Sequence, residues 1–377
     1  MSTLRQIQMG IKGLCEFLRK NAPSAFFRMP ITNLSGKRIA IDSHGYFHTI
    51  MAVARKNVVE STNILSGERP CPVEIRKCCL RMVLDFIVVW MSYGITPIFV
   101  FDGPDKPGKE EVREKRQESR NVIKKRIDQM YEEIEKSPLS ANALFLDLRR
   151  QLSNYGELSK EDFETYEAMI ANVGVPYIRA KGDGERLCSA MCVEGQVAAV
   201  FSKDTDNIAH GCPLLCTSFA KAYEYTDEGR VHLLECIRID EILKALSLEK
   251  ASFVDLCIMS GCDYNNNIPK ISVGRSFPLI KKHSSIDKLP TSMDVSCLNH
   301  VSCRELFGFT NSDSLILDGN KRLCFNQDAI GTCRDFMEAM SLADKILLLV
   351  QNKDNISKPE DGFPASLNLG NPFALSL

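Results

Sequence analysis

The sequence predicts an α/β fold, with a mostly parallel twisted sheet that carries helices on both faces. Three short apolar runs, at residues 38–42, 96–102 and 197–204, each end in an aspartate. Continuous apolar runs are typical of strands that are buried on both faces, as in a covered parallel sheet. Helical patterns alternate with these runs, and this alternation favours an α/β architecture.

The other expected elements are mainly helices. Residues 72–93 are expected to form the helix before the second strand, because apolar side chains recur there at the helical period and Gly94 follows as a stop. A polar helical stretch from about 123 to 169 resembles an insertion between two halves of the sheet. Further helices are expected at 186–193 and within 238–283, whereas 284–377 receives no role.

The overall charge excludes a globally basic nucleic-acid-binding chain. The 377 residues include 47 Lys and Arg against 48 Asp and Glu, so any site for a polyanion must be a local patch. The longest uncharged stretches are shorter than the roughly 20 apolar residues of a membrane span, so we expect no membrane partner.

The cysteines predict an intracellular protein. They number 15, an odd count, and the first residues lack the apolar core of a secretory leader, so reduced thiols are expected. The pairs Cys188/Cys192 and Cys212/Cys216 are spaced more widely than a typical zinc knuckle, which favours small buried hydrophobic side chains over zinc ligands.

The main basic patch lies at residues 104–129, with nine Lys and Arg against six acidic residues. Composition alone favours a solvated helix with ion pairs between successive turns.

Acidic residues recur at the ends of the expected elements. The carboxyl ends of parallel strands meet at one edge of a sheet, where ligands bind. A single aspartate there is ordinarily a cap, but these acids number seven: Asp42, Asp102, Asp183, Glu185, Asp204, Asp206 and Asp263. Converging carboxylates repel one another unless a cation neutralises them, so the set predicts bound divalent metal.

Six sequence blocks together resemble a known family. In chain order they are MGIKGL at 9–14, IAID at 39–42, FVFDG at 99–103, GVPY at 174–177, SKDTD at 202–206 and DLCIMSGCDY at 255–264. They resemble the XPG superfamily, the flap endonuclease and exonuclease-one group of structure-specific 5′ nucleases. The resemblance covers about residues 9–129 and 165–283, and 107–116 is most similar to the exonuclease-one branch. A viral member of the family would fit a chain of this size. With a DNA substrate and reduced thiols, the resemblance implies the nucleus or the cytoplasm, in the host cell if the source is viral.

The resemblance implies a PIN-like nuclease core with an insertion. Residues 9–103 would form its N-terminal half and 104–160 a helical gateway, or arch. Residues 161–283 would form the internal half, with a helix-hairpin-helix near 253–283, followed by a C-terminal region at 284–377. The family chain normally starts at the residue matched by Met9, so either translation starts there or the preceding residues bend away from the active site.

The implied activity is Mg²⁺-dependent hydrolysis of phosphodiester bonds in branched DNA, by 5′-flap endonuclease action, 5′→3′ exonuclease action or both. Two Mg²⁺ ions, replaceable by Mn²⁺, would be bound by the seven acids. Asp42, Asp102, Asp183 and Glu185 would hold one ion, and Asp204, Asp206 and Asp263 the other. Lys109 and Arg116, seven and fourteen residues after Asp102, match the family's cations at the scissile phosphate.

The implied partner is DNA with 5′ flaps, nicks or ends, bound by a monomer. Lys270, Ser272, Gly274 and Arg275 would contact duplex DNA at the hairpin. The family's Gly-Ile-Gly is replaced there by Lys270-Ile271-Ser272, which argues against the family's K⁺ site. His48 stands where flap endonucleases have a base-stacking tyrosine, and no sliding-clamp motif occurs.

A non-catalytic protein that keeps the fold and binds branched DNA is the alternative. The complete acid set argues against it, because a chain released from catalysis has no reason to keep seven mutually repelling carboxylates.

Overall fold

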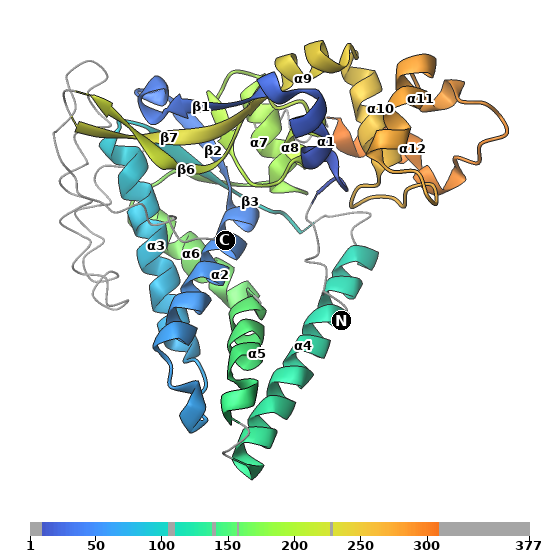
Figure 1. Ribbon diagram of the computed structural model, residues 1–377. Helices are drawn as coiled ribbons and strands as arrows, with labels where there is room; N and C mark the ends of the chain where they lie inside the picture. The colour runs from blue at the N-terminus through green and yellow to red at the C-terminus, as the bar shows by residue number, and fades with distance from the viewer. Residues whose placement is uncertain (1–9, 105–109, 138–140, 157, 227–228, 309–377) are drawn as a thin grey trace. The chain divides into compact units, whose positions relative to one another are not determined.

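The structure is a computed structural model that describes residues 10–104, 110–137, 141–156, 158–226 and 229–308 (Figure 1). The described chain forms two compact units. The first unit contains the chain up to residue 43, residues 95–104 and the chain from 178 to 308; the second contains 44–94 and 111–177, apart from the gaps just given.

A seven-stranded sheet forms the centre of the first unit, in the order β1-β7-β6-β5-β2-β3-β4. The strands are β1 (Phe26–Pro30), β2 (Arg38–Asp42), β3 (Thr96–Phe101), β4 (Tyr177–Arg179), β5 (Ala199–Phe201), β6 (Leu214–Thr226) and β7 (Gly229–Arg238). In β2, Ile41 is paired in parallel with Phe99 of β3 on one side and with Phe201 of β5 on the other. Strand β6 is parallel to β5, whereas β7 runs antiparallel to both β6 and β1.

The predicted α/β class with a mostly parallel sheet is confirmed, and the three apolar runs form β2, β3 and β5. The prediction missed β1, β4 and the hairpin of β6 and β7. The distal half of that hairpin carries exposed polar side chains such as Lys221 and Glu224, and Tyr225 there is 78% exposed. These residues lack the continuous apolar run that marked the central strands.

Seven helices accompany the sheet in the described part of this unit. They are α1 (Leu14–Asn21), α7 (Gly184–Val193), α8 (Asp206–Ala209), α9 (Ile239–Leu246), α10 (Lys250–Ser260), α11 (Val273–His283) and α12 (His300–Phe307). Helix α7 packs on β2, β3 and β5. Its buried Leu187 belongs to the same apolar cluster as Val100 of β3 and Val200 of β5, which fixes the helix against the centre of the sheet.

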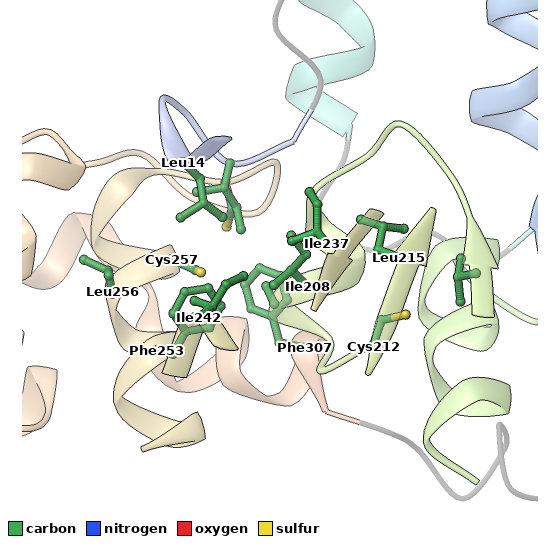
Figure 2. Close-up of a cluster of buried hydrophobic side chains, with 14 of the residues drawn as sticks. Leu14, Ile208, Cys212, Leu215, Ile237, Ile242, Phe253, Leu256, Cys257 and Phe307 are labelled. Atoms are coloured by element: carbon green, nitrogen blue, oxygen red, sulfur yellow. The ribbon is translucent and has the colours of Figure 1, made fainter. Parts of the chain in front are cut away.

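Figure 2 shows the part of this core that joins the sheet to the later helices. Leu215 of β6 and Ile237 of β7 lie in one cluster with Phe253 and Leu256 of α10 and with Phe307 of α12. All five are at least 96% buried. Burial of each such side chain contributes about 1.5–3 kcal/mol, so the cluster holds α10 and α12 firmly in place.

The second unit is helical in its described residues: α2 (Ser43–Ser61), α3 (Pro72–Ser92), α4 (Glu110–Lys136), α5 (Ala141–Asn154) and α6 (Lys160–Asn172). Helix α3 has the predicted bounds within one residue, and Gly94, two residues after its end, has a φ of +66°. The predicted polar helical stretch forms most of α4, α5 and α6, and Ser159 begins α6 with a capping box to Asp162. No helix in the described ranges is long and apolar enough to cross a bilayer.

Leu256→Ala is expected to lower the free energy of unfolding by about 2–5 kcal/mol, because the fully buried side chain leaves a cavity. Val301→Ala, at a position that is 61% exposed in the same unit, should change it by no more than about 0.5 kcal/mol. Urea unfolding of both variants measures the difference, and equal effects would contradict the described core.

Candidate metal centre and active site

Three adjacent parallel strands deliver acidic side chains to one edge of the sheet. Asp42 is the last residue of β2, and Asp102 directly follows β3. Asp204 comes three residues after β5 ends at Phe201. Because β2 pairs with both neighbours in parallel, the three strands end at the same edge.

The first turn of α7 lies against Asp102. The backbone N–H of Gly184 donates a hydrogen bond of 2.7 Å to Asp102 Oδ1. A Cβ atom at Gly184 would lie 3.0 Å from the same oxygen, so this approach requires a residue without a side chain. Asp183 and Glu185 flank this glycine, and α7 therefore brings two more carboxylates to the strand ends.

Ser202 links two of the acids. Its hydroxyl donates to Asp42 Oδ2 at 2.7 Å and accepts from the backbone N–H of Asp204 at 3.0 Å. Ser202 is only 2% exposed, so both hydrogen bonds are shielded from water. One side chain thus fixes Asp42 relative to the loop that carries Asp204.

The backbone near the start of the described chain packs against Asp204 and Asp206. The N–H of Ile11 donates to Asp206 Oδ1 at 2.9 Å, and the N–H of Asp206 donates to Asp204 Oδ1 at 3.0 Å. Gly10 has a φ of +79°, and a Cβ there would lie 2.5 Å from Asp204 Oδ1. Only glycine satisfies both constraints, so Gly10 permits this close approach.

Glu185, Asp204 and Asp206 form the tightest group, with one carboxylate oxygen of each within 4.8 Å of the others. Glu185 and Asp206 are buried. Burial raises the pKa of Asp204 well above its ordinary value, and the negative charges of Asp206, Glu185 and Asp42 raise it further. A buried set of oxygen donors under such repulsion fits a hard divalent cation such as Mg²⁺ or Mn²⁺.

The other four predicted metal ligands lie outside this tightest group. Burial raises the pKa of the Cys188 thiol on α7, and the negative charges of Asp42, Asp102 and Glu185 raise it further. Asp183 accepts a hydrogen bond of 2.8 Å from the hydroxyl of Tyr264. Asp263, half-buried, is the residue before this tyrosine.

Comparison with known proteins identifies the family. The XPG N-terminal domain model matches residues 9–123, and the XPG I-region model matches residues 174–263, together more than half of the chain. This chain belongs to the XPG family. The resemblance that the sequence blocks predicted is therefore confirmed.

Curated relatives of this XPG-family chain include Flap endonuclease 1 of Cryptosporidium muris, with 29% identity over 317 residues, 79% of this chain and 62% of the relative. The chain thus spans about three fifths of that relative's length. The Probable RAD2-like endonuclease 369L of Invertebrate iridescent virus 6 is 26% identical over 348 residues, with 81% of this chain and 82% of the viral protein covered.

Solved structures show the same fold. Flap endonuclease-1 from Methanococcus jannaschii matches with a TM-score of 0.54 and 21% identity, over 87% of this chain and 97% of that protein. The catalytic core of Rad2 in complex with DNA substrate matches with a TM-score of 0.53 and 15% identity, over 90% of this chain and 100% of the core.

Of the predicted DNA-binding residues of the XPG hairpin, Lys270 and Ser272 lie between α10 and α11, two helices that pack together, and Gly274 and Arg275 lie in the first turn of α11. Lys270, Ser272, Gly274 and Arg275 are all exposed. Arg275 Nη1 donates to the carbonyl of Lys270 at 2.9 Å, and Lys270 has a φ of +67°, a conformation that favours glycine. The backbone therefore keeps a glycine-like turn where the side chain is lysine.

The other predicted contacts belong to the second unit or fall outside the described residues. His48 lies on α2, where its ring meets the edge of Phe163 at 6.2 Å between centroids. Arg116 lies on α4 and is half-buried. Lys109 lies outside the described residues.

Five residues were given no individual role in the sequence analysis but contact the acids: Gly10, Ile11, Gly184, Ser202 and Tyr264. All except Gly184 occur in one of the blocks that carried the resemblance, and Ser202 stands two residues before an acid. The hydrogen bonds from these residues to Asp206, Asp102, Asp42 and Asp183 join positions at least 81 residues apart, and such contacts leave no periodic pattern in the sequence.

Asp204→Asn should stabilise the metal-free protein at pH 7 by about 1–3 kcal/mol, the range for relieving a poorly compensated buried polar group. The pKa of Asp204 is higher in the folded state than in the unfolded state, where it is near 4. The free energy of unfolding of the wild type therefore decreases as pH rises above about 4. The difference between variant and wild type should therefore grow from pH 4 to pH 7. Urea unfolding in EDTA measures it.

Asp162→Asn is the control of opposite sign. Although burial alone would raise the pKa of Asp162, hydrogen bonds from Ser159 and Arg76 lower it overall. The contribution of Asp162 is present above pH 4 and is lost as pH falls through its folded-state pKa, so this variant should be less stable than the wild type at pH 7. A destabilised Asp204→Asn variant at pH 7 would contradict the repulsion.

Proposed function

We propose that this protein is a metal-dependent, structure-specific nuclease that hydrolyses phosphodiester bonds in branched DNA, as a 5′-flap endonuclease, a 5′→3′ exonuclease or both. The close grouping of Glu185, Asp204 and Asp206 in a chain of the XPG family carries this proposal. The relatives named flap endonuclease and the Rad2 core in complex with DNA support DNA as the substrate.

The proposed cofactors are two Mg²⁺ ions, with Mn²⁺ as a substitute. Bound divalent cations lower the pKa of an attacking water and offset the charge on the scissile phosphate. Two groups of residues would hold them: Asp42, Asp102, Asp183 and Glu185 for one site, and Asp204, Asp206 and Asp263 for the other.

The chain's own contribution to the reaction is a rigid set of carboxylates. Ser202 orients Asp42, and the N–H of Gly184 orients Asp102, before any substrate arrives. Because these contacts are largely buried, charges at the site act through a lower effective dielectric than in water. A carboxylate that is already oriented needs no reorganisation in the transition state, so this arrangement supports a catalytic role as well as a binding role.

Several side chains outside the acid set would contact the DNA. We propose that Lys109 and Arg116, seven and fourteen residues after Asp102, contact the scissile phosphate. His48 would stack on the base pair beside the cut. Lys270, Ser272, Gly274 and Arg275, exposed at the start of α11, would bind the duplex backbone.

Non-catalytic binding of branched DNA is the competing function. A 5′-labelled flap, a nicked duplex and a blunt duplex, each incubated with Mg²⁺ or EDTA, separate the two. Mg²⁺-dependent cutting near the flap junction would support the nuclease, and tight binding without cutting would support the alternative.

Asp102→Ala should reduce flap cleavage by at least about 1,000-fold, because a cation-binding carboxylate at the end of β3 is lost. Binding of flap DNA, measured by fluorescence anisotropy in Ca²⁺, should change by less than about threefold. Asp240→Ala, which removes an exposed acid at the start of α9, is the control and should cleave normally. Normal turnover by Asp102→Ala would refute the proposal.

Arg116→Ala should lower the single-turnover cleavage rate by about 100-fold while flap binding stays within a few fold, because a cation helps most where charge develops. Lys125→Ala removes an exposed cation from the same helix and should reduce the rate far less. If the two variants lose rate equally, Arg116 has no special role at the phosphate.

A further inference from the structure

The hydroxyl of Tyr264 donates a hydrogen bond of 2.8 Å to Asp183 Oδ2, across 81 positions of sequence. The tyrosine is 8% exposed and the aspartate 9%, so water competes little for either partner. Hydrogen bonds to a charged group are shorter and about twice as strong as neutral ones. This contact therefore restricts the orientation of the Asp183 carboxylate.

Helix α12 in turn holds the ring of Tyr264. The ring of Phe307 meets it edge-on, with centroids 5.6 Å apart and planes at 81°. Phe307 also contacts the ring of His210, with centroids 5.2 Å apart, and the Phe307 carbonyl lies 3.3 Å from His210 Nδ1. His210 directly follows α8, the helix that starts at Asp206, so one phenylalanine packs behind both acid-bearing segments.

An ion pair anchors α12. Arg304 Nε and Nη2 each lie 2.7 Å from an oxygen of Asp255 on α10, and Asp255 is 2% exposed. Arg304 Nη2 also lies 2.8 Å from Asp287. The bidentate geometry fixes the rotation of α12 as well as its distance from α10.

We propose that Tyr264 is a positioning residue for the metal site: its hydroxyl holds Asp183 in the orientation that binds a cation, and α12 holds Tyr264 through Phe307. The inference rests on the proposed nuclease function. A freely rotating carboxylate loses rotational entropy when it binds a cation. The hydrogen bond from Tyr264 already restricts the rotation of Asp183, so less entropy is lost on binding. A hydroxyl directed at Asp183 also offsets part of the repulsion from the neighbouring acids.

Tyr264→Phe removes the hydroxyl and keeps the ring. In the full chain without DNA, we expect Mn²⁺ affinity, measured by electron paramagnetic resonance titration, to fall about 10- to 100-fold, the usual effect of removing a group that orients a metal ligand. At a fixed sub-saturating Mg²⁺ concentration, with the flap DNA concentration varied, kcat should fall by a similar factor while KM for DNA is unchanged. Tyr225→Phe, at a position 78% exposed, should match the wild type.

A double-mutant cycle with Asp183→Asn tests whether the hydroxyl acts through this carboxylate. If it does, Tyr264→Phe adds nothing to the loss of Mn²⁺ affinity in the Asp183→Asn background. An additive loss, or wild-type Mn²⁺ affinity in Tyr264→Phe, would overturn the inference and leave the nuclease function intact. A wild type that binds no Mn²⁺ would overturn the proposed function and this inference together.

Discussion

The mutual repulsion of carboxylates at one sheet edge is the constraint that the rest of the first unit must satisfy. Each of five acids receives at least one hydrogen bond, and for four of them the donor is at least 81 positions away in the sequence. The pairs are Ser202 with Asp42, Gly184 with Asp102, Tyr264 with Asp183, Asp206 with Asp204, and Ile11 with Asp206. The donors come from four separate segments, so the fold itself, and no single loop, keeps the charges in place against their repulsion.

The same constraint explains the small residues around the acids. Gly10 and Gly184 stand where a Cβ would come within 3.0 Å of a carboxylate oxygen. Backbone N–H groups can then approach the acids as donors from two directions, which side chains would block. Backbone donors have fewer rotatable bonds than side-chain donors, so they hold a carboxylate at a smaller entropic cost.

Much of this arrangement was predictable because it follows from short-range patterns. When apolar strands are parallel, the aspartates at their carboxyl ends are expected at one edge of the sheet, as Asp42 and Asp102 are. The contacts that orient the acids were not predictable in this way. Tyr264 meets Asp183 only because α10 and α7 pack in one core, and local sequence does not encode that long-range contact. The exposed half of β6 and β7 was missed for a related reason, since its polar residues carry no burial pattern.

The anchoring of α12 argues that orientation, more than stability, accounts for the ion pair of Asp255 and Arg304, in which the aspartate is buried and the arginine side chain is 32% exposed. Removing the aspartate charge from water costs several kcal/mol, and well-packed apolar residues in place of a buried ion pair are often as stabilising as the pair. Apolar packing of α12 is already supplied by Phe307 and Cys303, both buried. What an apolar pair would lack is the fixed geometry of two parallel hydrogen bonds, and that geometry sets where the Phe307 ring points. Apolar packing alone would be enough to keep α12 in the core. The ion pair is needed to fix the rotation of α12, because the Phe307 ring must contact Tyr264 at a fixed angle.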